Sequence, residues 1–313
     1  MTSFFQLRAA APRRIDMKTM KMLVKRNTKL FFKDKAMFFT SLATPLILLV
    51  LYATFLGGVY RDAFMASIPE GALIEGRVID GIVAGQLLSS LLSISCVTVS
   101  FCSNFLMVKD KAVGTIRDFT SSPVKSRTLA ISYYVSTLIS TLIVVFTAMA
   151  LGLVYMAIVG FYMSAIDILL LALDVILLVM FGTALSSVIA YFLSTEGQIS
   201  AVGSIISSVY GFISGAYMPI SSYAPSLRSI LGFLPGTYGT VLTRSHAMRG
   251  AISELEDVLP PDNINMIMES CDAKISHLGV LIPEWAMYLY ITLITSALVV
   301  TYVLLCKRKS VRK

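Results

Sequence analysis

The chain has 313 residues, of which 56% are hydrophobic and only 14% are charged, and its mean hydropathy is +0.79. Charged residues usually make up about a quarter of a soluble domain, so this composition excludes an ordinary water-soluble globular protein. The formal net charge of +8 lies beside apolar segments and therefore indicates a membrane surface and not a nucleic acid. With only four cysteines and two histidines, we expect neither a disulfide scaffold nor a metal site.

The N-terminal part precedes any segment that could cross a membrane. Residues 1–16 are predicted to form a mobile basic tail, and either Met1 or Met17 could be the start. No cleavable signal peptide is expected, because the first apolar run begins only at Ala36. Residues 17–35 are predicted to form an amphipathic helix lying in the membrane interface, with its lysines near anionic headgroups. The alternative is a basic flank that only orients the first span.

A transmembrane helix needs about 20 consecutive apolar residues. Six stretches meet this length, at about residues 36–60, 81–108, 129–159, 168–193, 198–219 and 285–306. A seventh candidate, residues 229–243, is too short and contains Pro235 and several glycines, so we predict an outer re-entrant hairpin there. The predicted fold is an all-α polytopic membrane protein with one transmembrane domain over residues 36–306 and a basic cytoplasmic tail at 307–313.

The positive charges predict the orientation. Of the 26 Lys and Arg residues, 20 lie before Ala36, in the loop 109–127 or after Cys306. Since basic residues concentrate in cytoplasmic segments, both termini and this loop are predicted to face the cytoplasm of a bacterial-type plasma (inner) membrane. The largest outer segment then covers residues 216–284. Its part from Ser245 to Ile282 has no assigned role, and short helices are expected at residues 253–259 and 264–276.

Two spans carry small residues at four-residue spacing, which places them on one helix face where another helix can approach closely. They are Gly85, Ser89 and Ser93 in the second span and Gly203, Ser207 and Gly211 in the fifth. This face predicts either a subunit interface or ordinary packing within one subunit. The second span is also rich in hydroxyl and amide groups, so a water-accessible pathway is a third interpretation.

Asp174 is the one charge well inside a predicted span, about 9 Å along the helix from Ile168. It is either a pathway acid or a hydrogen-bonded packing residue. His246 and His277 are both predicted to lie in the outer segment as solvated loop residues.

No phosphate-binding loop, HExxH, GxSxG or GxGxxG motif occurs, so the chain is predicted to bind no cofactor and to be no enzyme by itself. The loop 109–127 reads KDKAVGTIRDFTSSPVKSR. Gly114 permits a sharp turn, and Pro123 ends the helical stretch that follows it. Ile116 and Phe119 lie in this stretch three residues apart, so a helix places them on one face. This apolar pair predicts a docking site whose register Arg117 and Asp118 could fix, or else a pair that dips into the membrane surface or tucks under neighbouring helices.

This loop resembles the one between the second and third spans of ABC transporter type-2 permeases, with matches at Gly114-Thr115, Ile116, Phe119 and Ser122-Pro123-Val124. The segment SGAYMPISSYAPSLRSILGFLPGTYGTVLTR is similar to the outer re-entrant hairpin of that family. The matching positions there are Gly215, Pro219, Pro225, Leu234-Pro235 and Arg244. The likeness extends from about Met17 to Cys306.

The resemblance implies the permease subunit of an ATP-driven exporter that moves an amphipathic drug, antibiotic, lipid or peptide. It implies pairing with a second permease, identical or different, and with separate cytoplasmic ABC ATPase subunits that bind ATP and Mg. Loop 109–127 would be the coupling element. Membrane lipids are expected partners and nucleic acid is not. The alternatives are an ion-coupled secondary transporter using Asp174, and a membrane enzyme or immunity protein acting alone.

Overall fold

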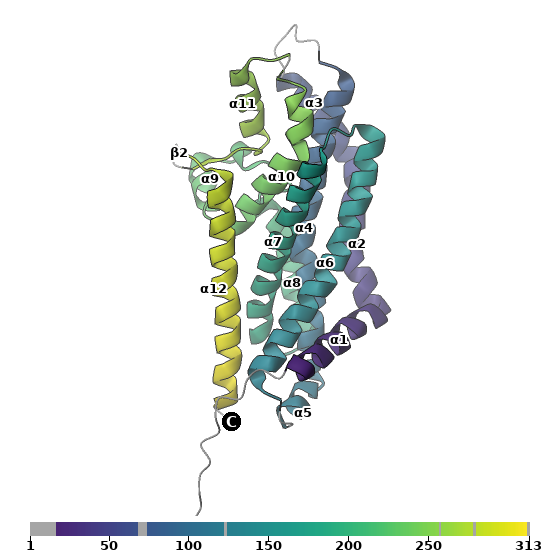
Figure 1. Ribbon diagram of the computed structural model, residues 1–313, viewed down its shortest axis with the longest axis vertical. Helices are drawn as coiled ribbons and strands as arrows, with labels where there is room; N and C mark the ends of the chain where they lie inside the picture. The colour runs from purple at the N-terminus through teal and green to yellow at the C-terminus, as the bar shows by residue number, and fades with distance from the viewer. Residues whose placement is uncertain (1–16, 68–73, 122–123, 257, 278–279, 312–313) are drawn as a thin grey trace, which may run out of the picture.

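The computed structural model describes residues 17–67, 74–121, 124–256, 258–277 and 280–311. The long helices stand side by side along one axis (Figure 1). The amphipathic helix α1, the short helix α5 and the end of α12 lie at one end of this bundle, and α3 and α11 lie at the other. The predicted tail 1–16 and Pro123 fall outside the described residues.

Five helical stretches are long and apolar enough to cross a membrane. They are Lys35–Asp62, Gly76–Ala112, Ser126–Val159, Ala165–Phe192 and Glu284–Lys307. These correspond to the predicted first, second, third, fourth and sixth spans. The multi-pass helical architecture is therefore confirmed, with a single pair of short strands among the described residues as the exception to all-α structure.

The N-terminal helix α1 covers Met17–Lys33, and Asp34 separates it from α2 at Lys35–Leu51. Asp34 caps α2 by accepting a hydrogen bond from the Met37 backbone N–H at 3.2 Å. A π-helical turn, Tyr52–Leu56, follows α2, and α3 continues over Gly57–Ser67. The first span is thus one helix with an internal irregularity.

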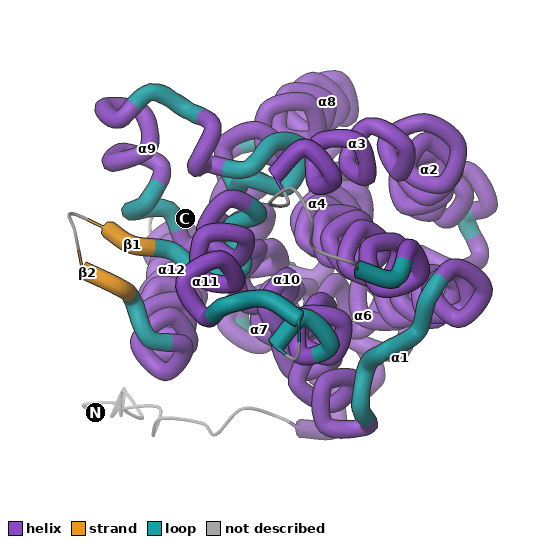
Figure 2. Tube along the Cα trace, turned by 90° about the horizontal axis from the view of Figure 1, so that it is seen from above, coloured by secondary structure: helices purple, strands orange, loops and turns teal. Residues whose placement is uncertain are grey.

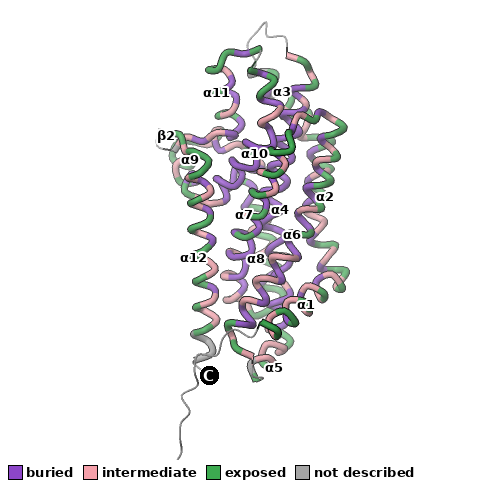
Figure 3. Tube along the Cα trace, viewed as in Figure 1, coloured by how far each residue is buried: buried purple, intermediate pink, exposed green. Residues whose placement is uncertain are grey.

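Helix α4, Gly76–Ala112, lies at the centre of the bundle, surrounded by α2, α6, α7, α8 and α10 (Figure 2). It is buried along nearly all its length (Figure 3). It is longer than the predicted second span at both ends, so Lys109, Asp110 and Lys111 belong to this helix and not to a loop.

Helix α6 covers Ser126–Val159, close to the predicted third span at 129–159, and ends at Gly160. Helix α7, Ala165–Phe192, begins with a capping box in which Ser164 and Asp167 bind each other's backbone N–H groups. The last span forms part of α12, Glu284–Val311.

The predicted fifth span differs from the structure. Helix α8 covers Glu196–Ile213, not residues 198–219, and it is not among the five candidate spans. Glycine and serine lower its apolar content, and a turn at Gly215, whose φ is +75°, directs the chain away from the helix axis.

The segment predicted to lie outside the membrane contains more ordered structure than the sequence predicts. A 3₁₀ turn at Ile220–Ser222 leads to α9, Pro225–Leu231, and then to α10, Pro235–Ser253. Both helices begin with proline at the first turn, where its missing N–H costs nothing. Helix α10 continues through Ser245, so the first part of the segment Ser245–Ile282, as far as Ser253, is helical and mostly buried. The prediction of a helix at 253–259 is wrong, because these residues form turns as far as they are described.

The helix expected at residues 264–276 forms instead as α11, Pro261–Ser270. The strands β1, Ser276–His277, and β2, Val280–Leu281, pair antiparallel just before α12.

Candidate functional site

The short helix α5, Thr115–Ser121, projects from the end of α4 at the same end of the bundle as α1 (Figure 1). Gly114 makes this turn with φ of +90°, a conformation that costs glycine little. The Arg117 N–H donates to the Gly114 carbonyl at 2.7 Å and so starts α5 immediately after the turn. No atom lies within 4 Å of the position of a Cβ at Gly114, so the backbone conformation, and not crowding, favours glycine here.

Ile116 and Phe119 lie on the inner face of α5. Both are half-buried and pack against an apolar cluster that includes Leu23 of α1 and Tyr133 of α6. The guanidinium of Arg26 lies 5.1 Å from the centre of the Phe119 ring. The structure therefore matches the alternative in which the pair tucks under neighbouring helices. Val113, Arg117 and Asp118 are among the exposed residues of this turn and of α5.

Arg26 also joins α1 to the end of α4. Its Nη1 lies 2.9 Å from an Asp110 carboxylate oxygen, and the Tyr133 hydroxyl donates to the same oxygen at 2.6 Å. Burial opposes the charge on Arg26, but the interactions with Asp110 outweigh it and raise the pKa of Arg26. Arg26 thus contacts α4 and α5 at once.

The two lysines beside Asp110 also bind within the chain. Lys109 forms an ion pair of 3.1 Å with Asp34. The Met37 N–H and Lys109 together hold the pKa of Asp34 below its ordinary value. Lys111 donates to the carbonyls of Ala190, Tyr191 and Leu193, at the C-terminus of α7 where helix carbonyls lack partners. All three charged residues before Gly114 therefore fix this end of α4 to other helices of the chain.

Most of the polar side chains of α4 form hydrogen bonds inside the bundle. Ser93 bonds Thr243 at 3.0 Å, and Asn104 donates to Ser186 at 2.6 Å and to Ser187 at 3.1 Å. Ser89 donates to its own helix, to the Gln86 carbonyl. Every one of these side chains is buried. This geometry agrees with packing inside one subunit and not with a water-accessible path along α4.

The small-residue faces of α4 and α8 differ in whether other residues cover them. A Cβ at Gly85 would lie 2.6 Å from the Ala247 carbonyl oxygen, so glycine allows α10 to approach α4. In α8, Gly211 is covered by the ring of Tyr217. Gly203, by contrast, has nothing within 4 Å of its Cβ position. Gly203 and the half-buried Ser207, one turn further along α8, therefore leave part of this helix face uncovered.

Among the residues of the expected re-entrant hairpin, Gly215 contacts the side chain of Arg244 in α10. The Arg244 side chain is fully buried and donates to the carbonyls of Cys271 at 2.7 Å and Gly215 at 2.9 Å, and to the Ser90 hydroxyl at 3.2 Å. Its closest carboxylate is Asp272, at 3.7 Å. Pro219 precedes the 3₁₀ turn, while Pro225 and Pro235 begin α9 and α10.

Asp272 in turn binds the backbone on the other side of this hairpin. Its carboxylate accepts hydrogen bonds from the N–H groups of Ile220 and Ser221, the latter at 3.1 Å. Burial raises the pKa of Asp272, and Arg244 and these N–H groups offset part of the rise. Burial likewise raises the pKa of the Cys271 thiol. The pair Arg244–Asp272 thus connects α10, the turn after α8 and the segment after α11.

The prediction that His246 is a solvated loop residue is wrong. His246 lies in α10, is fully buried and has its Nδ1 at 2.6 Å from a carboxylate oxygen of Asp174. The Tyr288 hydroxyl donates to the other oxygen of Asp174 at 2.5 Å. Burial lowers the pKa of His246, but Asp174 and the nearby Glu284 outweigh burial and raise it to about 9. Asp174 is thus a hydrogen-bonded residue between α7, α10 and α12.

Four residues that form the polar contacts described above were not expected from the sequence, namely Arg26, Asp272, His246 and Tyr288. Among the described residues, no group of three or more His, Cys, Asp or Glu side chains could hold a metal ion.

A comparison with family profiles matches residues 18–246 to the ABC-2 type transporter family. No curated protein matches the chain. The profile covers well over half of the sequence and includes α1, the spans from α2 to α7, α5, α8 and the first part of α10. The chain therefore belongs to the ABC-2 type transporter family and is the membrane permease part of an ABC transporter.

Proposed function

We propose that this permease is half of an ATP-driven exporter in a bacterial-type plasma membrane, with both termini in the cytoplasm and a separate ATPase as its motor. Helix α8 serves as a sixth membrane-crossing segment, because its 18 residues extend for about 27 Å, close to the thickness of the hydrocarbon layer. The grouping of α1, α5 and the end of α12 at one end of the bundle supports a common side for these segments.

The observation that carries the proposal is the way α5 is held. It projects at the end of the bundle, and Arg26 links it to α1 and to Asp110 of α4. A load applied to α5 from the cytoplasm therefore reaches the central helix through direct contacts. We assign the ATPase contact to the outward surface of this turn, where Val113, Arg117 and Asp118 lie.

The second permease, identical or different, binds along α8. Gly203 leaves open space on one side of this helix, and Ile205 and Val209 expose apolar side chains on another. Small and apolar residues on an exposed helix allow a second helix to approach closely in a membrane. Because hydrogen bonds within the subunit already use the polar face of α4, the substrate path lies between two permeases. An amphipathic drug, antibiotic, lipid or peptide fits such an apolar boundary.

Introducing a negative charge at Val113 tests whether the ATPase binds this surface. Val113 is 73% exposed, so Val113→Glu removes little packing and should leave the permease folded. We expect it to reduce co-purification of the ATPase and transport-linked ATP hydrolysis at least tenfold. The matched control is Met266→Glu, which makes a similar change at a residue 70% exposed on α11, at the opposite end of the bundle.

The result that would refute this assignment is ATPase binding and export by Val113→Glu at the level of Met266→Glu. A variant at Phe119 is less informative, because Phe119 packs inside the chain and its loss would also disturb Arg26.

The contact between Asp174 and His246 favours a second candidate, an ion-coupled secondary transporter, since it brings an acid and a base together inside the bundle. Transport in proteoliposomes distinguishes the two candidates. The exporter needs ATP and the ATPase, whereas the ion-coupled protein works alone with an ion gradient.

A further inference from the structure

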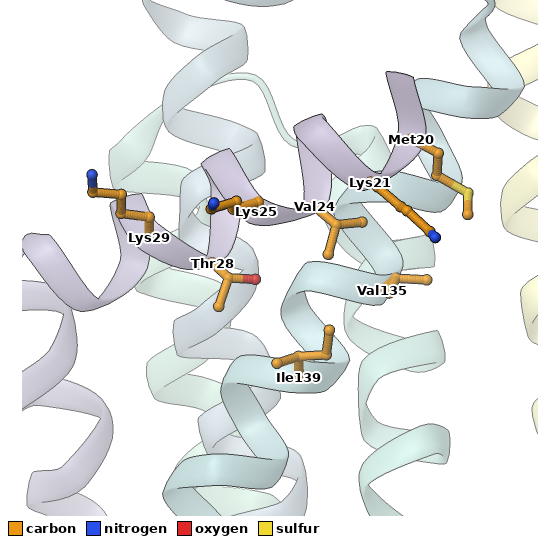
Figure 4. A pocket seen from close by; sticks show the side chains of 8 residues that line it. All are labelled: Met20, Lys21, Val24, Lys25, Thr28, Lys29, Val135 and Ile139. Atoms are coloured by element: carbon orange, nitrogen blue, oxygen red, sulfur yellow. The ribbon is translucent and has the colours of Figure 1, made fainter. Parts of the chain in front are cut away.

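An open groove of about 580 Å³ lies between α1 and α6, away from the contacts described above (Figure 4). Its wall is apolar and comes from both helices, with Met20 and Val24 on α1 and Val135 and Ile139 on α6. Three lysines of α1 border it, namely Lys21, Lys25 and Lys29. The volume lies within the range of about 300–1,000 Å³ that is usual for sites of small ligands.

The lysines form a regular row. They are four residues apart, so they lie on successive turns of α1 with about 6 Å between neighbours along the helix axis. All three are exposed. Within the described part of the chain, no carboxylate forms an ion pair with any of them. Asp34 and Asp110, which lie at this end, pair with Lys109 and Arg26. The row therefore has unneutralised positive charge.

The apolar wall continues from this row along α6. Val135 and Ile139 are one turn apart on the same face, and Ile139 is the farther of the two from the start of α6 at Ser126. Figure 4 shows both side chains facing the side of α1 that carries Val24 and Thr28. A molecule with an anionic head beside the lysines and an apolar tail along Val135 and Ile139 would match both parts of the groove.

We infer that this groove binds one anionic phospholipid from the leaflet that surrounds α1. Its phosphate lies between neighbouring lysine ammonium groups, and an acyl chain covers Val24, Val135 and Ile139. A free anion would leave the apolar wall uncovered. A second copy of the chain docked symmetrically would set one lysine row against another, which like-charge repulsion opposes.

The test measures binding of phosphatidylglycerol and phosphatidylcholine to the purified full-length permease by native mass spectrometry, without ATPase or substrate. We expect one phosphatidylglycerol molecule per chain to be retained in preference to phosphatidylcholine. The variant Lys21→Gln/Lys25→Gln/Lys29→Gln should lower the phosphatidylglycerol affinity on the order of 100-fold, since each ammonium group near an anionic lipid contributes about fivefold.

Two matched controls separate a built site from general attraction. The variant Lys307→Gln/Arg308→Gln/Lys309→Gln removes the same charge after the last span and should retain the lipid. Ile139→Trp should fill the groove and weaken binding about tenfold. Ile143→Trp, at a residue 47% exposed one turn along α6, should leave binding unchanged.

Equal loss in the two triple variants would overturn the site, because it would mean that only net charge attracts the lipid. Retention by the first triple variant, equal binding of both lipids, or binding of inorganic phosphate alone with the same dependence on the lysines would overturn it too. So would the appearance of a dimer that protects this row. None of these outcomes depends on whether the protein is an exporter.

Discussion

Arg244→Met tests whether the buried pair Arg244–Asp272 holds the outer hairpin together. Methionine is apolar and flexible, so it fills part of the space of arginine without supplying a donor. The substitution removes the hydrogen bonds to the carbonyls of Gly215 and Cys271, and it leaves Asp272 without its nearest positive charge. Arg244 is fully buried, so water cannot replace these contacts without opening the hairpin.

The expected cost follows from what is left behind. Breaking a buried charged pair by removing one partner typically costs about 3–5 kcal/mol. Each buried carbonyl without a donor adds about 1–3 kcal/mol where the chain cannot relax. Since the hairpin can relax locally, we expect Arg244→Met to lower the free energy of unfolding by about 3–5 kcal/mol. Arg228→Met on α9, a half-buried residue, should change it by less than about 0.5 kcal/mol.

Thermal unfolding in detergent, followed with a thiol-reactive dye, measures the loss. None of the four cysteines forms a disulfide, and Cys96 and Cys271 are buried in the folded chain. The pH dependence has a defined sign. Burial raises the pKa of Asp272 and Arg244 opposes the rise, so the pKa is higher still in Arg244→Met. A raised carboxyl pKa favours the folded state as the pH falls, so the deficit should shrink from pH 8 to pH 5.

Two outcomes would refute this reasoning. One is a stability of Arg244→Met within about 0.5 kcal/mol of the wild type. The other is a deficit that stays the same or grows as the pH falls, which would mean that Asp272 is not the group left without a partner. Adding Asp272→Asn should recover about 1–2 kcal/mol at pH 7, because it removes the unpaired charge.

Three further predictions concern topology, assembly and coupling. In intact cells, Ser310→Cys should escape an impermeant thiol reagent while Ser226→Cys on exposed α9 reacts, and labelling of Ser310→Cys would contradict cytoplasmic termini. Gly203→Leu should weaken permease pairing at least tenfold, as judged by cross-linking, whereas Gly197→Leu, at an equally open glycine, should pair normally. Asp174→Asn should keep substantial ATP-driven export while costing about 1–3 kcal/mol of stability, because Asp174 accepts bonds from Tyr288 and His246; complete loss of export with normal folding would favour ion coupling.

The spans with long apolar runs were predictable from the sequence, because the thickness of the membrane sets their length. The π-helical turn at Tyr52–Leu56 and the end of α8 at Ile213 were not, since both depend on local backbone geometry inside a uniformly apolar or glycine-rich stretch. The position of Gly114 was predictable, because a turn between two helical patterns requires a residue that tolerates positive φ.

Long-range polar contacts were harder to predict. Positively charged residues in a segment outside the predicted spans are normally solvated. Apart from the family resemblance, nothing in the sequence indicated that Arg244 is buried, and nothing indicated that His246 is buried. Their partners Asp272 and Asp174 are 28 and 72 residues away in sequence, and no spacing rule connects such pairs. The ion pair of Arg26 was partly predictable. Arg26 lies next to apolar residues of the amphipathic helix α1, where an unpaired charge would be costly.

The length of α4 has a mechanical consequence. Its 37 residues make a rod of about 55 Å, well beyond the roughly 30 Å of hydrocarbon, and the structure shows no break in it. One end is held at Asp110, and Gly85, about 14 Å from the other end at Gly76, meets the backbone of α10. A tilt of about 5° about the end at Ala112 would displace the end at Gly76 by about 5 Å, about the rise of one helical turn. If α5 is the coupling element, a stiff rod of this kind would convert a small angular movement there into a displacement at the opposite end of the bundle.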